Sequence, residues 1–303
     1  MTPTSRHGNA LGPVVAGVDG SASSREAVLW AAGEADRRGQ HLRLVLGADL
    51  DRLGRFAAFE TTERLREAGG THLAEAHEAV HERFPGLPVE RELSNKNAVA
   101  ALQEAAAPDA TVVVGSRGLG GFPALLLGSV SLAVATRSSV PVVVVRGRTD
   151  RPGTGVVAAA VRDETDADWV RRAAAEAELR GGTLHLINVW NPLSHVGNMV
   201  TALDDPGDIT EQGRARTDAL AAVVHRSHPA LTVTTATGAG TATAAALMDV
   251  SGRADLLVMG VRRRFMGSGP ALGRLGHAAL HHARCPVEIV PRPGEPEQEE
   301  SWR

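Results

Sequence analysis

The 303-residue chain contains very little lysine, cysteine or aromatic character. Lys96 is its only lysine, so a phosphate loop of the G-x-x-x-x-G-K-[ST] type is excluded, and any phosphate site must use backbone amides, hydroxyls or arginine. Cys285 is its only cysteine, which excludes an intrachain disulfide and agrees with a reducing compartment. With 3% aromatic residues, the chain lacks the material for a base-stacking surface.

The net charge is small, and the apolar runs are short. The 35 acidic and 32 basic residues leave a formal charge of −3, so no field of the whole chain attracts nucleic acid or an anionic membrane. No apolar run reaches the roughly 18 residues of a membrane span, and the first residues lack the apolar core of a secretory signal. We therefore expect a cytoplasmic protein with neither a nucleic-acid nor a membrane partner, and the length predicts two domains.

An internal repeat supports that division. The segments RRGQHLRLVL (37–46) and LRGGTLHLIN (179–188) align at a constant offset of 142 residues, whereas ATVVVGSRG (110–118) and DLLVMGVRR (255–263) align at 145. Two constant offsets indicate a duplicated unit with one small length change inside it. The sequence predicts one copy over 1–148, a second over 152–293, a polar Gly- and Pro-containing boundary within 147–155, and an acidic, disordered tail over 294–303.

Each copy has the pattern of an α/β domain. In the first, helical stretches at 23–38 and 57–82 lie between short apolar runs rich in β-branched residues. Near-continuously apolar strands that alternate with helices favour a doubly wound parallel sheet, whose ligands bind at the carboxyl ends of the strands. The five predicted strands are Pro13–Val18, Leu42–Ala48, Val89–Leu93, Thr111–Val114 and Val140–Val145.

The loops after the first and fourth strands carry the candidate site. The fourth strand leads into Gly115-Ser116-Arg117-Gly118, and nine residues later Gly128-Ser129 opens a helix. Glycines let a phosphate approach the backbone, and amides at a helix N-terminus stabilise anions. Asp19, after the first strand, offers an acceptor for an adenine amino group or ribose hydroxyls. It could equally be the N-cap of the next helix, as could Ser21, Ser23 or Ser24.

These residues resemble the universal stress protein family. VVAGVDGS, VVVGSRGLGGFPALLLGSVS and PVVVVR match its strands and its G-2x-G-9x-G-[ST] motif, which falls here on Gly115, Gly118, Gly128 and Ser129. The resemblance implies two tandem flavodoxin-like five-stranded sheets and a stress or dormancy regulator that binds ATP, with Mg²⁺ optional. The ATP-binding residues that it implies are Ala16, Gly17, Val18, Asp19, Ala48, Gly115, Ser116, Arg117, Gly118, Gly128, Ser129, Val130 and Ser131.

The second copy departs from this pattern. Its loop begins at Gly260, but Arg263 replaces the second glycine, Arg274 replaces the serine, and the offset of 142 places Val161 at the position of Asp19. We expect no ordinary ATP site there. The arginines are interpreted as a solvated loop, with a domain or partner contact, or an anion bound in another pose, as alternatives.

Two further predictions concern assembly and metal. The family often pairs its last strands across a dimer interface, so Val142–Val145 and Val287–Val290 are predicted to pair within the chain; a homodimer and an unknown protein partner are left open. His277, His281, His282 and Cys285 have spacing that zinc can use, but the stretch resembles the family's ordinary last helix and strand, and packing is preferred.

Two other functions compete with nucleotide sensing. One is slow ATP hydrolysis or autophosphorylation at Ser129 or Ser131, against which stands the lack of a general base or metal-ligand set in the motif. The other is a protein-interaction module without nucleotide dependence.

Overall fold

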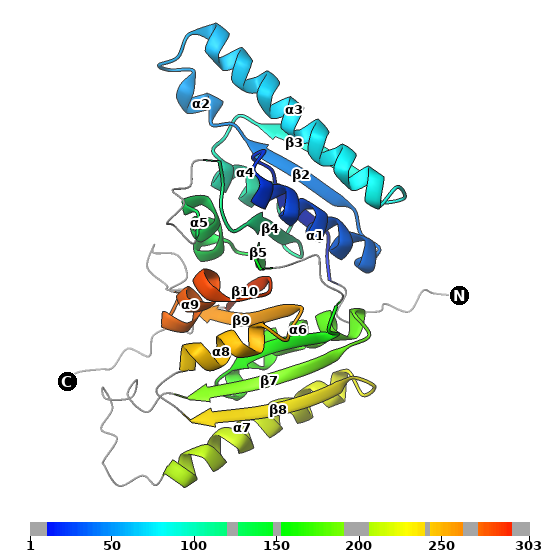
Figure 1. Cartoon of the computed structure of the whole chain (residues 1–303), viewed down its shortest axis with the longest axis vertical. Helices are drawn as coiled ribbons and strands as arrows, with labels where there is room; N and C mark the ends of the chain where they lie inside the picture. The colour runs from blue at the N-terminus through cyan, green and yellow to red at the C-terminus, as the bar shows by residue number, and fades with distance from the viewer. Residues whose placement is uncertain are drawn as a thin grey trace, which may run out of the picture.

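The computed structural model describes residues 11–119, 127–147, 153–190, 206–239, 243–262 and 272–292. Within them, ten strands form one sheet in the order β3-β2-β1-β4-β5-β10-β9-β6-β7-β8. We call the first five strands with their helices unit one and the last five unit two; unit one lies above unit two in Figure 1. The strands are β1 (Val14–Gly17), β2 (Leu42–Gly47), β3 (Val89–Ser94), β4 (Thr111–Gly115), β5 (Val142–Val145), β6 (Val156–Val161), β7 (Thr183–Trp190), β8 (Thr232–Ala239), β9 (Leu256–Arg262) and β10 (Val287–Arg292).

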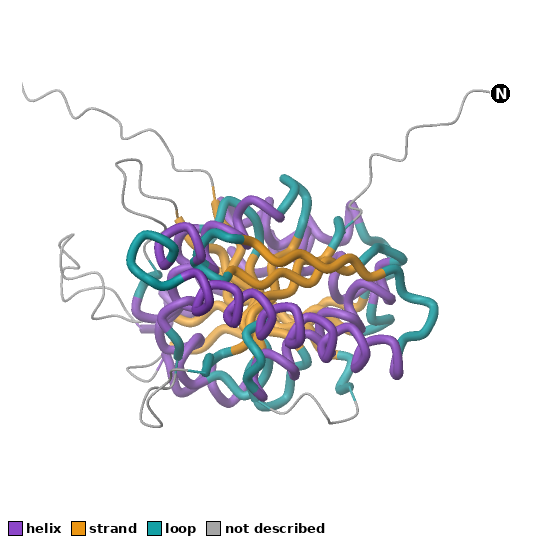
Figure 2. Tube along the Cα trace, turned by 90° about the horizontal axis from the view of Figure 1, so that it is seen from above, coloured by secondary structure: helices purple, strands orange, loops and turns teal. Residues whose placement is uncertain are grey.

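Helices cover both faces of this sheet (Figure 2). They are α1 (Ala22–Arg38), α2 (Leu50–Leu53), α3 (Phe59–Arg83), α4 (Ala98–Ala105), α5 (Ser129–Arg137), α6 (Ala167–Leu179), α7 (Pro206–Ser227), α8 (Thr243–Ser251) and α9 (Arg274–His282), with a 3-10 turn η1 (Glu164–Asp166) before α6. Side chains of α1, α3, α6 and α7 join one buried cluster, and those of α4, α5, α8 and α9 join the other. The α/β doubly wound class is therefore confirmed. In each unit the strand order reverses between the first and the fourth strand, and such folds bind ligands at this point.

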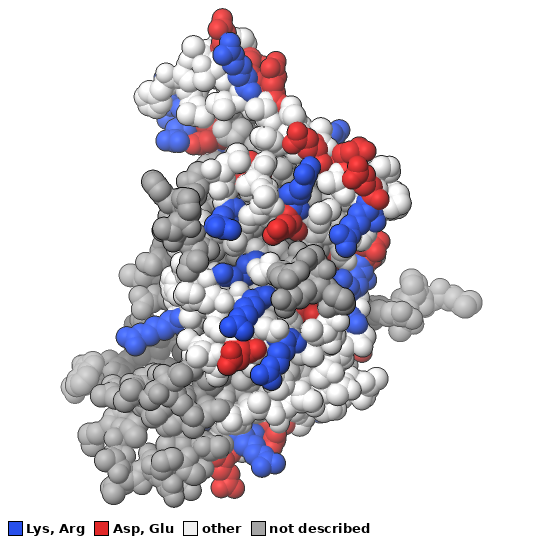
Figure 3. Space-filling view, viewed as in Figure 1, with Lys and Arg blue, Asp and Glu red and all other residues white. Residues whose placement is uncertain are grey.

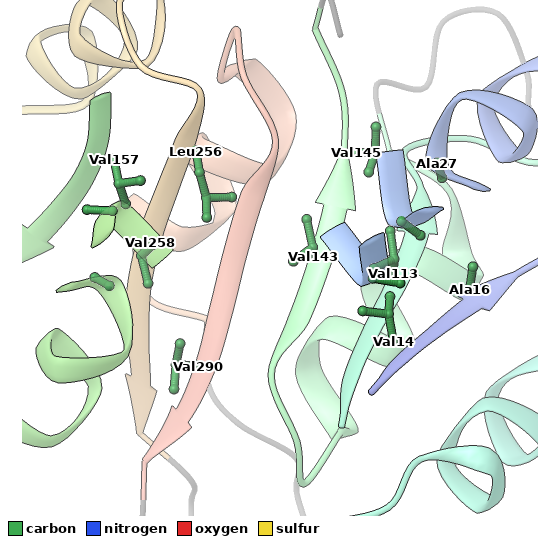
Figure 4. Packing of buried hydrophobic residues seen from close by; sticks show 14 of the residues in the cluster. Val14, Ala16, Ala27, Val113, Val143, Val145, Val157, Leu256, Val258 and Val290 are labelled. Atoms are coloured by element: carbon green, nitrogen blue, oxygen red, sulfur yellow. The ribbon is translucent and has the colours of Figure 1, made fainter. Parts of the chain in front are cut away.

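The strands are held by β-branched side chains on both faces. Along β4 and β5 every residue is buried, as expected for parallel strands covered by helices on both sides. Val14, Val113 and Val143 lie together below α1, and Val157 and Val258 form the matching group of unit two (Figure 4). The predicted strand positions were right to within one or two residues, but the short helix α2 was missed.

The local signals explain where α1 begins and ends. The Ser21 hydroxyl accepts a hydrogen bond from the Ser24 backbone N–H, which satisfies one unpaired donor at the N-terminus. Gly39 ends the helix in a left-handed conformation (φ 62°), which favours glycine. Ser21, and not Asp19, is thus the N-cap.

The two units join along β5 and β10, which pair in antiparallel fashion: Val144 opposite Val287, Val143 opposite Glu288 and Val142 opposite Ile289. The prediction that the last strands pair within the chain is confirmed. All other strand pairs in the described sheet are parallel. We call the β5–β10 contact, together with the ends of α1 and α6 beside it, the seam.

The strand register corrects one residue match. Val14 pairs with Leu42 and Thr111, and Val157 pairs with their counterparts Leu184 and Leu256. The offset from β1 to β6 is therefore 143 rather than 142, because unit two has one residue fewer between this strand and its helix. Arg162, not Val161, occupies the position of Asp19.

Candidate functional site

The glycine loop of unit one follows β4 directly and contacts the start of α5. The Gly128 N–H donates to the Ser116 carbonyl oxygen (2.8 Å), and the Ser131 hydroxyl donates to the Gly115 carbonyl oxygen (2.6 Å). Ser131 is buried, whereas Ser129 and Val130 are exposed at the first turn. These bonds bring the two halves of the predicted motif together, although residues 120–126 between them lie outside the described part of the chain.

The N-terminus of α1 reaches the same loop. The Arg117 N–H donates to Ser23 Oγ (3.3 Å), the Ser21 hydroxyl donates to the Arg117 carbonyl oxygen (3.4 Å), and the hydroxyls of Ser23 and Ser116 lie 3.5 Å apart. The first turns of α1 and α5 contain no acidic residue. Two helix N-termini therefore meet at one loop, and the positive ends of both helix dipoles favour an anion there.

Asp19 lies beside this loop. Its Oδ1 accepts a hydrogen bond from the Ser21 N–H (2.9 Å), and its backbone N–H donates to Ser24 Oγ (3.2 Å). Its Oδ2 is 2.6 Å from the place that a side-chain Cβ at Gly118 would occupy. A side chain at 118 would have to displace the Asp19 carboxylate, so the loops after β1 and β4 lie against each other.

Gly20 is constrained in two ways that the sequence did not reveal. Its φ of +83° favours glycine, and a Cβ there would lie 2.6–2.8 Å from the imidazole of His72 on α3. His72 therefore supports the turn that presents Asp19. No pattern in the sequence connected α3 to this loop, since the contact depends on how the helix crosses the sheet.

The remaining predicted residues lie at the same sheet edge or directly below it. Ala16 and Val18 are buried, so they can offer a ligand only backbone atoms, and the Gly17 carbonyl accepts from the Ser24 hydroxyl (3.0 Å). Ala48 follows β2, forms an isolated bridge with Asn97 and donates its backbone N–H to the Ser94 carbonyl oxygen (2.9 Å). The structure thus brings Asp19 and the start of α1 to the glycine loop, which is the phosphate side of the predicted site.

Unit two has different side chains at the equivalent positions. The indole of Trp169 lies directly against Gly260, where Ser23 lies against Gly115 in unit one. Trp169 is buried. Its bulk replaces a hydroxyl-bearing helix start with an aromatic ring.

Ion pairs also occupy the loop after β6. Both Arg162 and Arg292 contact Asp166 Oδ1, at 3.6 Å and 2.5 Å, and the Arg162 N–H donates to Asp166 Oδ2 (2.7 Å). Arg274 is exposed at the start of α9, whereas Arg263 lies outside the described residues. A basic side chain thus stands where unit one has Asp19.

The single lysine and the single cysteine have ordinary surroundings. Lys96 Nζ binds both carboxylate oxygens of Glu104 (2.7 and 2.9 Å), and this hydrogen bonding raises the pKa of the lysine. Burial raises the pKa of the Cys285 thiol to about 12. Among the residues that the structure describes, no group of three His, Cys, Asp or Glu side chains could hold a metal ion.

The surface shows no single dominant charge on the face in Figure 3, where basic and acidic side chains alternate over both units. In the described part of the chain, no helix combines the length and apolar character that a membrane span requires.

Comparison with known proteins agrees with the fold. The family model described as "Universal stress protein family" matches residues 11–146 and 155–291. A universal stress protein of Mycobacterium tuberculosis is 29% identical over 289 residues, covering 92% of this chain and 96% of that protein, and one of Mycolicibacterium smegmatis is 40% identical over 141 residues, covering 45% and 46%. A universal stress protein structure from Archaeoglobus fulgidus has a TM-score of 0.69 at 20% identity and covers 92% of this chain and 98% of that one. The chain therefore belongs to the universal stress protein family, with two of the family's domains in tandem.

Proposed function

We propose that unit one binds ATP at the loop between β4 and α5 and that the chain acts as a cytoplasmic regulator responding to adenine nucleotide. The observation that carries the proposal is the meeting of two helix N-termini, of α1 and α5, at Gly115–Gly118. Such ends attract phosphate through free N–H groups and helix dipoles, without lysine.

The side chains around the loop fit a triphosphate. Ser23, Ser116 and Ser129 supply hydroxyl donors, and Arg117 supplies a cation. Gly118 and Gly128 leave room for phosphate oxygens beside the backbone. Asp19 supplies one carboxylate, which suits a ribose hydroxyl or, if Mg²⁺ accompanies the phosphates, that ion.

Binding without rapid turnover follows from the composition of the motif. Phosphoryl transfer needs metal ligands and a group that positions the nucleophile. The segments Gly115–Gly118 and Gly128–Ser131 contain neither a carboxylate nor a histidine. The proposed role is therefore that of a sensor, with Asp19 as the loop's carboxylate contact.

A second candidate, autophosphorylation, is favoured at one serine by its exposure. Ser131 is buried and its hydroxyl already donates to the Gly115 carbonyl oxygen, whereas Ser129 is exposed beside the phosphate loop. Of the two serines, Ser129 is the acceptor that this activity would use.

Calorimetric titration of the full chain with ATP, ADP and AMP tests the proposal. Wild type should bind ATP with a sub-millimolar Kd, and Gly118→Arg should abolish binding because its side chain displaces Asp19. Gly86→Arg is the matched control, since a Cβ at Gly86 meets nothing within 4 Å. Absence of ATP binding by wild type would contradict the proposal, and phosphate release well above background would favour an enzyme.

A further inference from the structure

A cluster of six charged side chains lies on one face of the seam, almost completely shielded from solvent. Their side chains are between 0% and 15% exposed, and three positive charges balance three negative ones. The members of this seam charge cluster are Glu34, Arg38, Arg172, Glu176, Arg180 and Glu288. The other face of the seam is apolar, formed by Val142, Val144, Val287 and Ile289.

Four of the six charges are symmetric between the units. Arg38 Nη2 donates to Glu176 Oε1 and Arg180 Nη2 donates to Glu34 Oε1, both at 2.6 Å. Glu34 and Glu176, like Arg38 and Arg180, are 142 residues apart and so occupy equivalent positions. A contact in which each side offers the same residues is self-complementary, so this quartet would form equally well between two copies of either unit.

The other two charges belong to unit two alone. Arg172 Nε donates to Glu288 Oε1 (2.6 Å), and Arg172 Nη2 donates to Thr111 Oγ1 across the seam (2.7 Å). The equivalent residues of unit one are Trp30, at offset 142 from Arg172, and Val143, at offset 145 from Glu288. Charge therefore distinguishes the two sides of the seam.

Glu288 has a special place in this arrangement. It pairs with Val143, the residue at the equivalent position of β5. This pair therefore lies on the local two-fold axis between the units. Pairing of two copies of unit two would place Glu288 opposite Glu288 at a fully buried position, and like charges directly opposite one another are unfavourable. Arg172 would also face Leu256, the equivalent of Thr111, and lose its acceptor across the seam.

Unit one carries no such obstacle. Two copies of it would place Val143 opposite Val143 and keep a quartet of Glu34 and Arg38 from each copy. We propose that Glu288 and Arg172 restrict unit two to pairing with unit one, whereas the seam surface of unit one also accepts unit one of a second chain. When the internal seam opens, two chains pair through their unit-one surfaces.

Matched substitutions in the full chain test this selectivity by sedimentation velocity. Arg180→Glu places a carboxylate against Glu34 across the seam, and Arg38→Glu places one against Glu176. The two substituted positions are equivalent in the two units. Arg180→Glu frees an intact unit-one surface and should give a dimer. Arg38→Glu leaves only unit two intact and should dimerise about 100-fold more weakly, because opposed like charges disfavour an interface strongly. Adding Arg172→Trp and Glu288→Val to Arg38→Glu should restore the dimer.

A second pair opens the seam from its apolar face, in case the first pair leaves it closed. Ile289→Lys and Val144→Lys occupy equivalent buried positions, 145 residues apart. Ile289→Lys should give a dimer, and Val144→Lys should give a monomer. In the Ile289→Lys dimer, adding Val143→Cys in a Cys285→Ser background should cross-link the two chains. Dimers from both members of a pair, or monomers from both Arg180→Glu and Ile289→Lys, would overturn the proposal.

Discussion

Removing one carboxylate of the seam charge cluster should destabilise the whole chain. The perturbation is Glu176→Gln, which keeps the side-chain shape but removes the charge that Arg38 and Arg180 both contact. Burial by itself would raise the pKa of Glu176, but the attraction of Arg180, Arg38 and Arg172 outweighs it and holds the pKa at about 2, against an ordinary value of 4.5. The difference corresponds to a loss of about 3 kcal/mol at pH 7.

The pH dependence gives an independent check with a definite sign. A carboxylate whose folded pKa is lowered stabilises the protein above its unfolded pKa and loses this contribution as pH falls through the folded value. Wild type should therefore lose its advantage over Glu176→Gln between about pH 4.5 and pH 2. Glu34 is a poorer choice for the test, because burial raises its pKa against the attraction of Arg180.

Guanidinium chloride unfolding at 25 °C, repeated from pH 7 to pH 3, measures both effects. Asp168→Asn is the matched control: its side chain is 90% exposed beside Arg171, and its loss should change stability by less than about 0.5 kcal/mol. A loss below about 1 kcal/mol for Glu176→Gln at pH 7, or one that does not shrink on acidification, would show that the charge of Glu176 does not stabilise the seam.

Three further results follow from the site and the cores. Gly118→Ala should weaken ATP binding about tenfold or more, because its Cβ would lie 2.6 Å from Asp19 Oδ2; unchanged calorimetric affinity would count against the assigned loop. Gly260→Ala should destabilise unit two by about 1–3 kcal/mol in denaturant titrations through its clash with the indole of Trp169, and a neutral effect would show that the ring moves freely. Cys285 should react with a thiol reagent at pH 8 only as fast as the protein opens, since burial raises its pKa to about 12; rapid labelling of the native chain would contradict its buried position.

Much of the fold was accessible from the sequence, because hydrophobic period and repeat spacing are local signals. The two offsets located the equivalent strands, and the valine runs of β4 and β5 identified buried parallel strands. The helix α2 was missed because four residues carry no periodicity. The Val161 match failed because a single-residue length change between β6 and its helix lies in a stretch with no shared motif, and the pairing of Val157 with Leu184 and Leu256 reveals it.

The geometry of the candidate site was predicted in part. The glycine spacing indicated the loop, and Asp19 was correctly placed at the same sheet edge, but its close approach to Gly118 depends on how two loops cross in space. His72 and Trp169 contact glycines far away in sequence, so no local pattern could identify them. The seam charge cluster was detectable in principle, since Glu-x-x-x-Arg recurs at Glu34 and Glu176 with the offset of the repeat.

The loops of the two units differ in their chemistry. Unit one presents glycines, serines and two helix N-termini, whereas unit two presents Trp169 against Gly260 and Arg162 at the position of Asp19. Native mass spectrometry of the full chain with increasing ATP tests this difference most directly. One nucleotide per chain, lost in Gly118→Arg, is the expected result; two nucleotides per chain, or one that persists in Gly118→Arg, would contradict it.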